Sequence, residues 1–214
     1  MIMIYVHMLV RTQPALGRPF LRNSYIIDHL TQQHKRDNDN VAVVYFYCNH
    51  KDQSTQTTYN LVASLLKQLV QDFPHTFERV NTEYRSHREK QIRPTLSEVC
   101  NTLKKEFSEF SRVFIVVDAL DEVSEDDSRA ELLTSLQVIG ASLLVTSRDI
   151  PIIGTALRGN QRMDIRARHD DICKYIEGRI RSGSHLTQLG RLLDKHPHVK
   201  QKVLECLPEK AQGI

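Results

Sequence analysis

The chain has 214 residues, which is long enough for one domain and a small appendage. Its 40% hydrophobic and 26% charged residues are typical of a globular protein and exclude collagen-like, mucin-like and wholly disordered chains. Its 29 basic and 26 acidic residues give a net charge of +3, which is too small to indicate a nucleic-acid or membrane surface. The sequence contains no tryptophan for stacking bases and no apolar run of 18 residues, so we expect no transmembrane helix.

The cysteines and the start of the chain bear on the compartment. Four cysteines lie far apart without a CxxC pair, which favours buried thiols in a reducing compartment over a disulfide framework. The apolar segment Ile2–Val10 has no basic residue before it and no small-residue cleavage site after it. These flanks favour a buried strand over a signal peptide, and we expect a cytoplasmic protein.

Strand and helix patterns alternate through the first half of the chain. Apolar residues at helical spacing run from Leu21 to Leu30. Val41–Tyr47 is β-branched and aromatic without alternation, which indicates a strand covered on both faces. A strong helix is expected over Thr55–Phe73, ended by Pro74. The polar stretch His75–Lys90 has apolar residues on one face and predicts a single surface helix.

The same alternation continues in the second half. Thr95 and Glu98 form a capping-box pattern that predicts the start of a helix reaching Phe107. Strands alternating with helices at this spacing predict a parallel α/β sandwich. The further expected elements are a buried strand at Arg112–Asp118, a helix at Ser128–Val138, a strand at Ser142–Thr146, an edge strand at Arg162–Arg166, a helix at Asp170–Arg181 and a helical tail at Leu186–Leu207 broken by Pro197.

A cluster of carboxylates follows the most apolar strand. Asp118, Asp121 and Glu122 come directly after the run Phe114–Val117. Open α/β sheets bind ligands at the carboxyl ends of their strands, so these acids are expected to line a crevice. Asp118 is the candidate ligand of Mg²⁺, and Asp121 or Glu122 would orient or polarise a hydrolytic water. The alternative is a strand that simply ends in a polar turn.

Four segments in order resemble NACHT-type signal-transduction NTPases, particularly the nephrocystin-like modules abundant in fungi. FIVVDALDE resembles the Walker B segment of that family, and VAVVYFYCNHKDQSTQTTYNLVASLLKQL resembles its second strand and following helix. SLLVTSRDIP resembles the sensor strand, and IRARHDDICKYIEGRI resembles the stretch that leads into the helical small domain. The resemblance covers about 25–180 and extends into the tail.

The resemblance implies a fold, a cofactor and a set of site residues. It implies a three-layer P-loop NTPase-like core over residues 1–166, incomplete at its N-terminus, followed by the start of a helical small domain over 167–214. ATP or GTP with Mg²⁺ would be the cofactor, and Arg148 would face the γ-phosphate. In the family, nucleotide state controls oligomerisation of a larger signalling protein. This chain resembles a fragment of such a protein or a short diverged copy of one.

The expected phosphate loop departs from the family pattern. In a GxxxxGK[ST] loop, backbone N–H groups wrap the phosphates, the lysine neutralises them and the hydroxyl binds Mg²⁺. Here Gly17 keeps the pattern, Arg18 stands at the lysine position and Pro19 replaces the hydroxyl residue. Proline offers neither a hydroxyl nor a backbone N–H. The loop therefore predicts weak nucleotide binding, and whether the chain is an enzyme stays open.

Two functions from different classes remain open at this point. The first is a nucleotide-dependent switch that binds ATP and Mg²⁺ weakly through Asp118, Arg148 and the remaining loop. The second is a non-catalytic protein-interaction module that retains the NTPase fold. Expected partners are other domains of a larger signalling assembly, with self-association possible and with neither nucleic acid nor membrane.

Overall fold

The computed structural model describes residues 3–8, 20–36, 40–165, 174, 178 and 188–212. The chain divides into two compact units: the first contains the sheet as far as Met163, and the second includes the C-terminal helices. The boundary expected between residues 166 and 167 stays a prediction. In the described parts of the chain, every helix is too short or too polar to cross a membrane.

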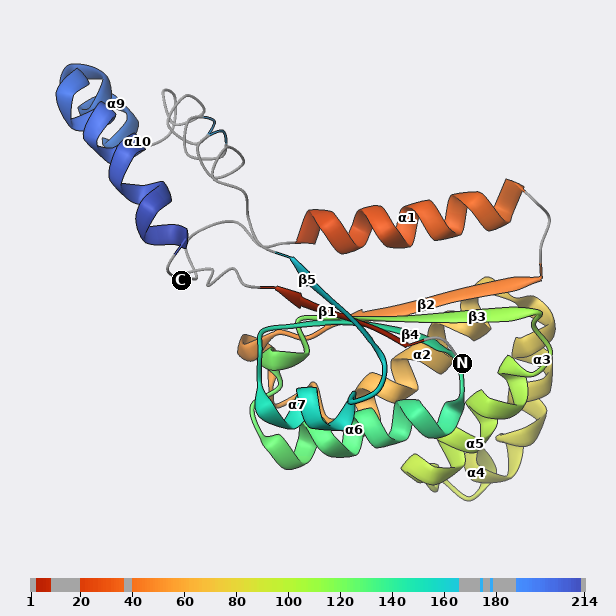
Figure 1. Ribbon diagram of the computed structural model, residues 1–214. Helices are drawn as coiled ribbons and strands as arrows, with labels where there is room; N and C mark the ends of the chain where they lie inside the picture. The colour runs from red at the N-terminus through yellow and green to blue at the C-terminus, as the bar shows by residue number, and fades with distance from the viewer. Residues whose placement is uncertain are drawn as a thin grey trace. The chain divides into compact units, whose positions relative to one another are not determined.

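A five-stranded sheet forms the centre of the first unit, in the order β2-β3-β4-β1-β5 (Figure 1). β2 pairs with β3, β3 with β4 and β4 with β1, and all three pairings are parallel. Non-consecutive neighbours such as β4 and β1 arise because helices carry the chain between parallel strands. The strands are β1 (Met3–Met8), β2 (Val41–Tyr47), β3 (Arg112–Asp118), β4 (Ser142–Ser147) and β5 (Gln161–Ile165).

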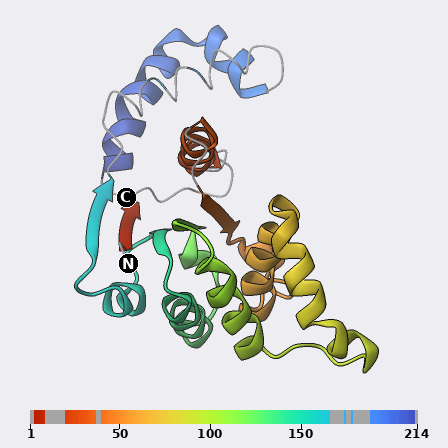
Figure 2. The same cartoon turned by 90° about the vertical axis from the view of Figure 1, so that its right-hand side faces the viewer.

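Helices cover both faces of this sheet (Figures 1 and 2). α1 (Phe20–Arg36) lies on one face, where the ring of His34 stacks on Phe114 of β3 with 5.7 Å between ring centroids. The other helices of the unit gather on the opposite face. They are α2 (Thr58–Asp72), α3 (Pro74–Glu83), α4 (Arg85–Glu89), α5 (Leu96–Phe107), α6 (Asp126–Ile139) and α7 (Pro151–Ala156), with short 3₁₀ turns η1 (His50–Asp52) and η2 (Leu120–Glu122).

The core forms between the sheet and the larger helical layer. Alternate strand residues, such as Val44, Ile115 and Val145, are buried against leucines of the covering helices. On β3 even adjacent residues are buried, since Ile115 is 0% and Val116 1% exposed. The uninterrupted apolar run in this strand is explained by burial on both faces, which parallel sheets require.

The expected elements are largely present, with one correction. Val41–Tyr47 and Arg112–Asp118 form strands with the predicted bounds, and the capping box of Thr95 and Glu98 makes both of its hydrogen bonds. The single helix expected at His75–Lys90 is wrong, because α3 and α4 are separated at Tyr84. The Tyr84 backbone has φ −88° and ψ 4°, and its hydroxyl lies 3.0 Å from Thr102 of α5, so a tertiary contact accompanies the break.

The C-terminal unit contains two described helices, α9 (Gln188–Lys195) and α10 (Pro197–Gln212). The predicted break at Pro197 is confirmed, because α10 begins at this residue. Within the unit Leu193 is buried, and Lys200 forms an ion pair of 2.9 Å with Asp194. The helix expected at Asp170–Arg181 lies outside the described residues, apart from positions 174 and 178.

Candidate functional site

The carboxyl ends of the parallel strands bring the candidate residues to one edge of the sheet. Tyr47 at the end of β2 pairs with Asp118 at the end of β3, and Arg148 directly follows β4. β1 ends on the same edge, since His7 pairs with Ser147. The structure therefore places Asp118 and Arg148 together, as the parallel arrangement predicted.

Asp118 is a buried carboxylate oriented by a threonine. Asp118 is only 5% exposed, and the Thr146 hydroxyl donates a 2.5 Å hydrogen bond to its Oδ1. The same hydroxyl accepts a 3.0 Å hydrogen bond from the Ala119 backbone N–H. Thr146 thus fixes both the carboxylate and the first peptide after the strand. It is part of the site although sequence reasoning gave it no role.

A left-handed residue turns the chain after Asp118. Ala119 has φ 55° and ψ 49°, a conformation that favours glycine because it crowds a Cβ atom. The 3₁₀ turn η2 follows at once, and the Glu122 N–H donates to the Ala119 carbonyl at 2.9 Å. This turn places Asp121 and Glu122 beside the ends of the neighbouring strands.

Asp121 and Arg148, which were expected to act separately, are bound to each other. Both carboxylate oxygens of Asp121 accept from Arg148: Oδ1 from its backbone N–H at 3.1 Å and Oδ2 from its Nε at 2.5 Å. The Asp121 side chain is 7% exposed, whereas that of Arg148 is 56% exposed. Asp121 thus fixes the Arg148 backbone and side chain at the end of β4.

Glu122 is held by His50 from the turn after β2. Its Oε2 accepts from the His50 backbone N–H at 3.0 Å and lies 2.6 Å from His50 Nδ1. Partial burial raises the pKa of Glu122, but the two His50 hydrogen bonds and the charges of His50 and Arg148 outweigh it, so the pKa lies below its ordinary value. Sequence reasoning gave His50 no role. The signal that could have identified it is its position shortly after β2, because β2 ends at the same edge of the sheet as β3.

Cys48 completes the described edge as a structural residue. Its backbone N–H donates to the Asp118 carbonyl at 2.9 Å and so extends the β2–β3 pairing by one residue. Burial raises the pKa of the thiol strongly, and the negative charges of Asp118, Asp121 and Glu122 raise it further. A thiol in this state is a poor nucleophile, which agrees with the structural role expected from the sequence.

The expected phosphate loop is the other half of the candidate site. Gly17, Arg18 and Pro19 lie outside the described residues, which resume with α1 at Phe20. In the described ranges, no three His, Cys, Asp or Glu side chains are grouped as a metal site. A single carboxylate such as Asp118 suits Mg²⁺ only when phosphate oxygens share the ion, so the fit to Mg²⁺ is partial.

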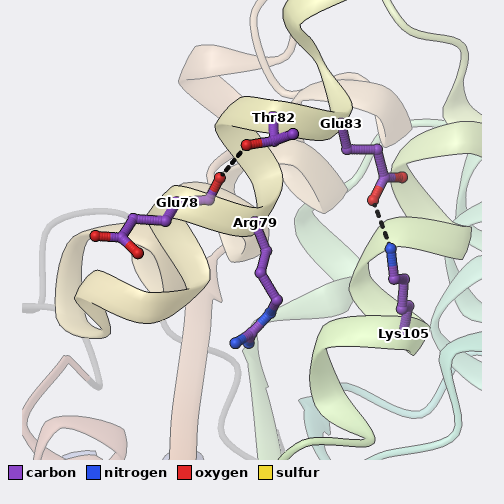
Figure 3. A pocket seen from close by; sticks show the side chains of 5 residues that line it. All are labelled: Glu78, Arg79, Thr82, Glu83 and Lys105. Atoms are coloured by element: carbon purple, nitrogen blue, oxygen red, sulfur yellow. Dashed lines mark hydrogen bonds and ion pairs between the residues drawn. The ribbon is translucent and has the colours of Figure 1, made fainter.

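A separate surface depression of about 510 Å³ lies between α3 and α5 (Figure 3). Its charges compensate one another, because Glu83 pairs with Lys105 at 3.1 Å and Arg79 binds the fully buried Glu106 at 2.9 Å. The Thr82 hydroxyl donates to the Glu78 carbonyl of its own helix. The two ion pairs join α3 to α5 and are structural.

The fold and the residues at its edge define the class of protein. A parallel sheet between helices, with carboxylates following β3, is a P-loop NTPase-like α/β fold, as expected from the sequence. Residues 7–148 match the family model described as Nephrocystin 3, N-terminal. The chain belongs to this family, and the resemblance to nephrocystin-like NACHT modules is confirmed.

The chain is similar to two solved structures, of which the first supports the fold alone. The Orc1 protein of Aeropyrum pernix, solved in complex with DNA, is similar with a TM-score of 0.51 and 14% identity over 85% of this chain and 43% of that one. PCH-2 of C. elegans matches with a TM-score of 0.28 and 11% identity over 83% of this chain and 50% of that one. The chain thus spans half the length of these proteins or less. A search of curated proteins finds no match.

Proposed function

We propose that this nephrocystin-like NACHT module acts as a switch module of a signalling protein, with weakened nucleotide binding. Membership of the family supports the module itself. Impaired nucleotide binding is supported by the acidic edge and by the sequence of the expected phosphate loop. ATP or GTP with Mg²⁺ is the ligand class that the P-loop NTPase-like fold favours.

The observation that carries the proposal is the engagement of each acid by this chain's own residues. Asp118 accepts from Thr146, both oxygens of Asp121 accept from Arg148, and Glu122 is held by His50. Arg148 would approach a phosphate with only part of its guanidinium, because Nε is bound to Asp121, and Glu122 would polarise a water only through Oε1, because Oε2 is held by His50. These charge-assisted hydrogen bonds reduce what the acidic edge offers a nucleotide, so tight binding would depend on the phosphate loop.

The phosphate loop is the part that offers least. Arg18 supplies positive charge, but its wide planar guanidinium differs from the compact ammonium that a phosphate loop normally encloses. Pro19 supplies neither an N–H for the phosphates nor a hydroxyl for the metal. When bound, Mg²⁺ would neutralise phosphate charge beside Asp118. Because Pro19 has no hydroxyl, the loop would give that ion one ligand fewer than a GxxxxGK[ST] loop does.

The alternative proposal is a non-catalytic interaction module that retained the fold. The pairing of Asp121 with Arg148 favours it, since a buried carboxylate with an arginine partner also stabilises a strand end without any ligand. In both proposals the partners are other protein domains of a larger signalling assembly in the cytoplasm. Self-association fits either one, and neither calls for nucleic acid or a membrane.

Restoring the loop tests the proposal. We expect the variant Arg18→Lys with Pro19→Thr to bind ATP and Mg²⁺ more tightly than the unmodified chain in a calorimetric titration. The matched control adds Asp118→Asn to the restored variant, and this third change should remove the Mg²⁺-dependent part of the gain. A restored variant that binds no better than the unmodified chain would favour the interaction module.

A further inference from the structure

β2 forms an outer border of the described sheet, and its role there is independent of the proposed nucleotide site. In the described sheet β2 is the terminal strand, with β3 on one side only. An edge strand presents a row of N–H and C=O groups that can template pairing with another chain. How this edge is covered therefore bears on whether the protein associates with itself.

β2 has the composition of a strand that self-associates. Val41–Tyr47 reads VAVVYFY, with β-branched and aromatic residues and with no charge, proline or glycine. Segments of six or seven residues with these properties are the usual signature of intermolecular β-pairing. A second copy of the same strand is the partner that fits such an edge.

The side-chain amide of Gln68 covers the middle of this edge. The Tyr45 N–H donates to Gln68 Oε1 at 3.0 Å, and Gln68 Nε2 donates to the Tyr45 carbonyl at 2.6 Å. One amide therefore occupies both outward backbone groups of one strand residue. A residue of a neighbouring antiparallel strand makes the same pair of bonds.

Gln56 covers the end of the edge in a related way. Its Nε2 donates to the Tyr47 carbonyl at 3.0 Å, and its Oε1 accepts from the Asn49 N–H at 2.8 Å. Bridging the C=O of one residue and the N–H of the second residue along is what a residue in a parallel strand does. The two glutamines thus replace the bonds that an additional strand would make.

We infer that Gln56 and Gln68 act as a side-chain substitute for a sixth strand, and that they close the β2 edge against pairing with a second copy of this chain. Gln68 projects from α2, so the helix that packs on the sheet also shields its border. Loss of both amides exposes the outward groups of Tyr45, Tyr47 and Asn49 beside an uncharged apolar strand.

The test compares two double variants of the full chain. The edge variant is Gln56→Ala with Gln68→Ala. The control is Gln53→Ala with Gln71→Ala, which removes two exposed glutamines from the same stretch of chain. Light scattering after gel filtration is recorded over a concentration series, and circular dichroism checks that both variants are folded.

The expected result is that the mass of the edge variant rises with concentration to at least about twice that of the control, as pairing of two edges requires. In the associated species, hydrogen exchange should show new protection of the backbone amides of Val41–Tyr47. Equal masses for the two variants, or association without that protection, would overturn the inference.

A measurement on the unmodified chain covers the case in which the edge variant does not fold. The outward amide of Tyr45 should exchange about tenfold more slowly than that of Val43, whose N–H no glutamine of the described residues covers, because one net hydrogen bond gives a factor of this size. Equal exchange rates at the two positions would refute the closure by Gln68.

Discussion

Replacing Ala119 with glycine should stabilise the protein, although the same change usually destabilises. Ala119 has φ 55° and ψ 49°, and this left-handed conformation costs a residue with a Cβ atom about 1–2 kcal/mol. Glycine relieves that cost but adds about 0.5–1 kcal/mol of backbone freedom to the unfolded chain. The Ala119 N–H keeps its hydrogen bond to Thr146 in either case. We therefore expect a net gain of about 0.5–1 kcal/mol.

The assay is chemical denaturation of the two chains, with a third variant as a matched control. Ala130→Gly makes the same chemical change inside α6, where glycine should cost about 0.5–1 kcal/mol. The two substitutions should thus shift the free energy of unfolding in opposite directions. In a melting experiment, each kcal/mol should move the melting temperature by roughly 2–4 °C. A loss of stability in both variants would show that the turn after β3 is not left-handed.

Further predictions concern the central strand and the acidic edge. Ile115→Ala should lower the free energy of unfolding by roughly 2–5 kcal/mol in urea, because the side chain is fully buried; a loss below about 1 kcal/mol would contradict its central position. Thr146→Val should cost about 1–3 kcal/mol by leaving the Asp118 oxygen and the Ala119 N–H without this partner, whereas Thr146→Ser should cost less; equal losses would refute the role of the hydroxyl. The lowered pKa of Glu122 adds stability that is fully present above the group's ordinary pKa of about 4.3 and is lost as pH falls through the lowered pKa. The stability difference from Glu122→Gln should therefore shrink as pH falls below that ordinary value. A difference that grows toward acid pH would contradict that sign.

The sheet and its acidic edge could be predicted because their causes are local in the sequence. Val41–Tyr47 is apolar or aromatic throughout, and so is the run from Val113 to Val117 within Arg112–Asp118, so the positions of both strands follow from burial on both faces. Parallel pairing then requires that Asp118 and Arg148 meet at one edge. The capping box of Thr95 was equally readable, because its two hydrogen bonds connect residues three apart.

The features that escaped prediction depend on contacts between distant segments. The break at Tyr84 accompanies a bond to Thr102, and Glu122 is held by His50, 72 residues earlier in the chain. The spacing of apolar residues contains no information about such pairs. The glutamines that cover β2 belong to the same class, since Gln68 reads in the sequence as an ordinary polar position of an amphipathic helix.

The direct test of the central claim is the affinity of the unmodified chain for ATP in the presence of Mg²⁺. The pairing of Asp121 with Arg148 and of Glu122 with His50, together with Arg18 and Pro19 in the loop, predicts a Kd of about 1 mM or weaker by calorimetry, which corresponds to about −4 kcal/mol. Binding in the micromolar range would contradict the account and restore an active nucleotide switch.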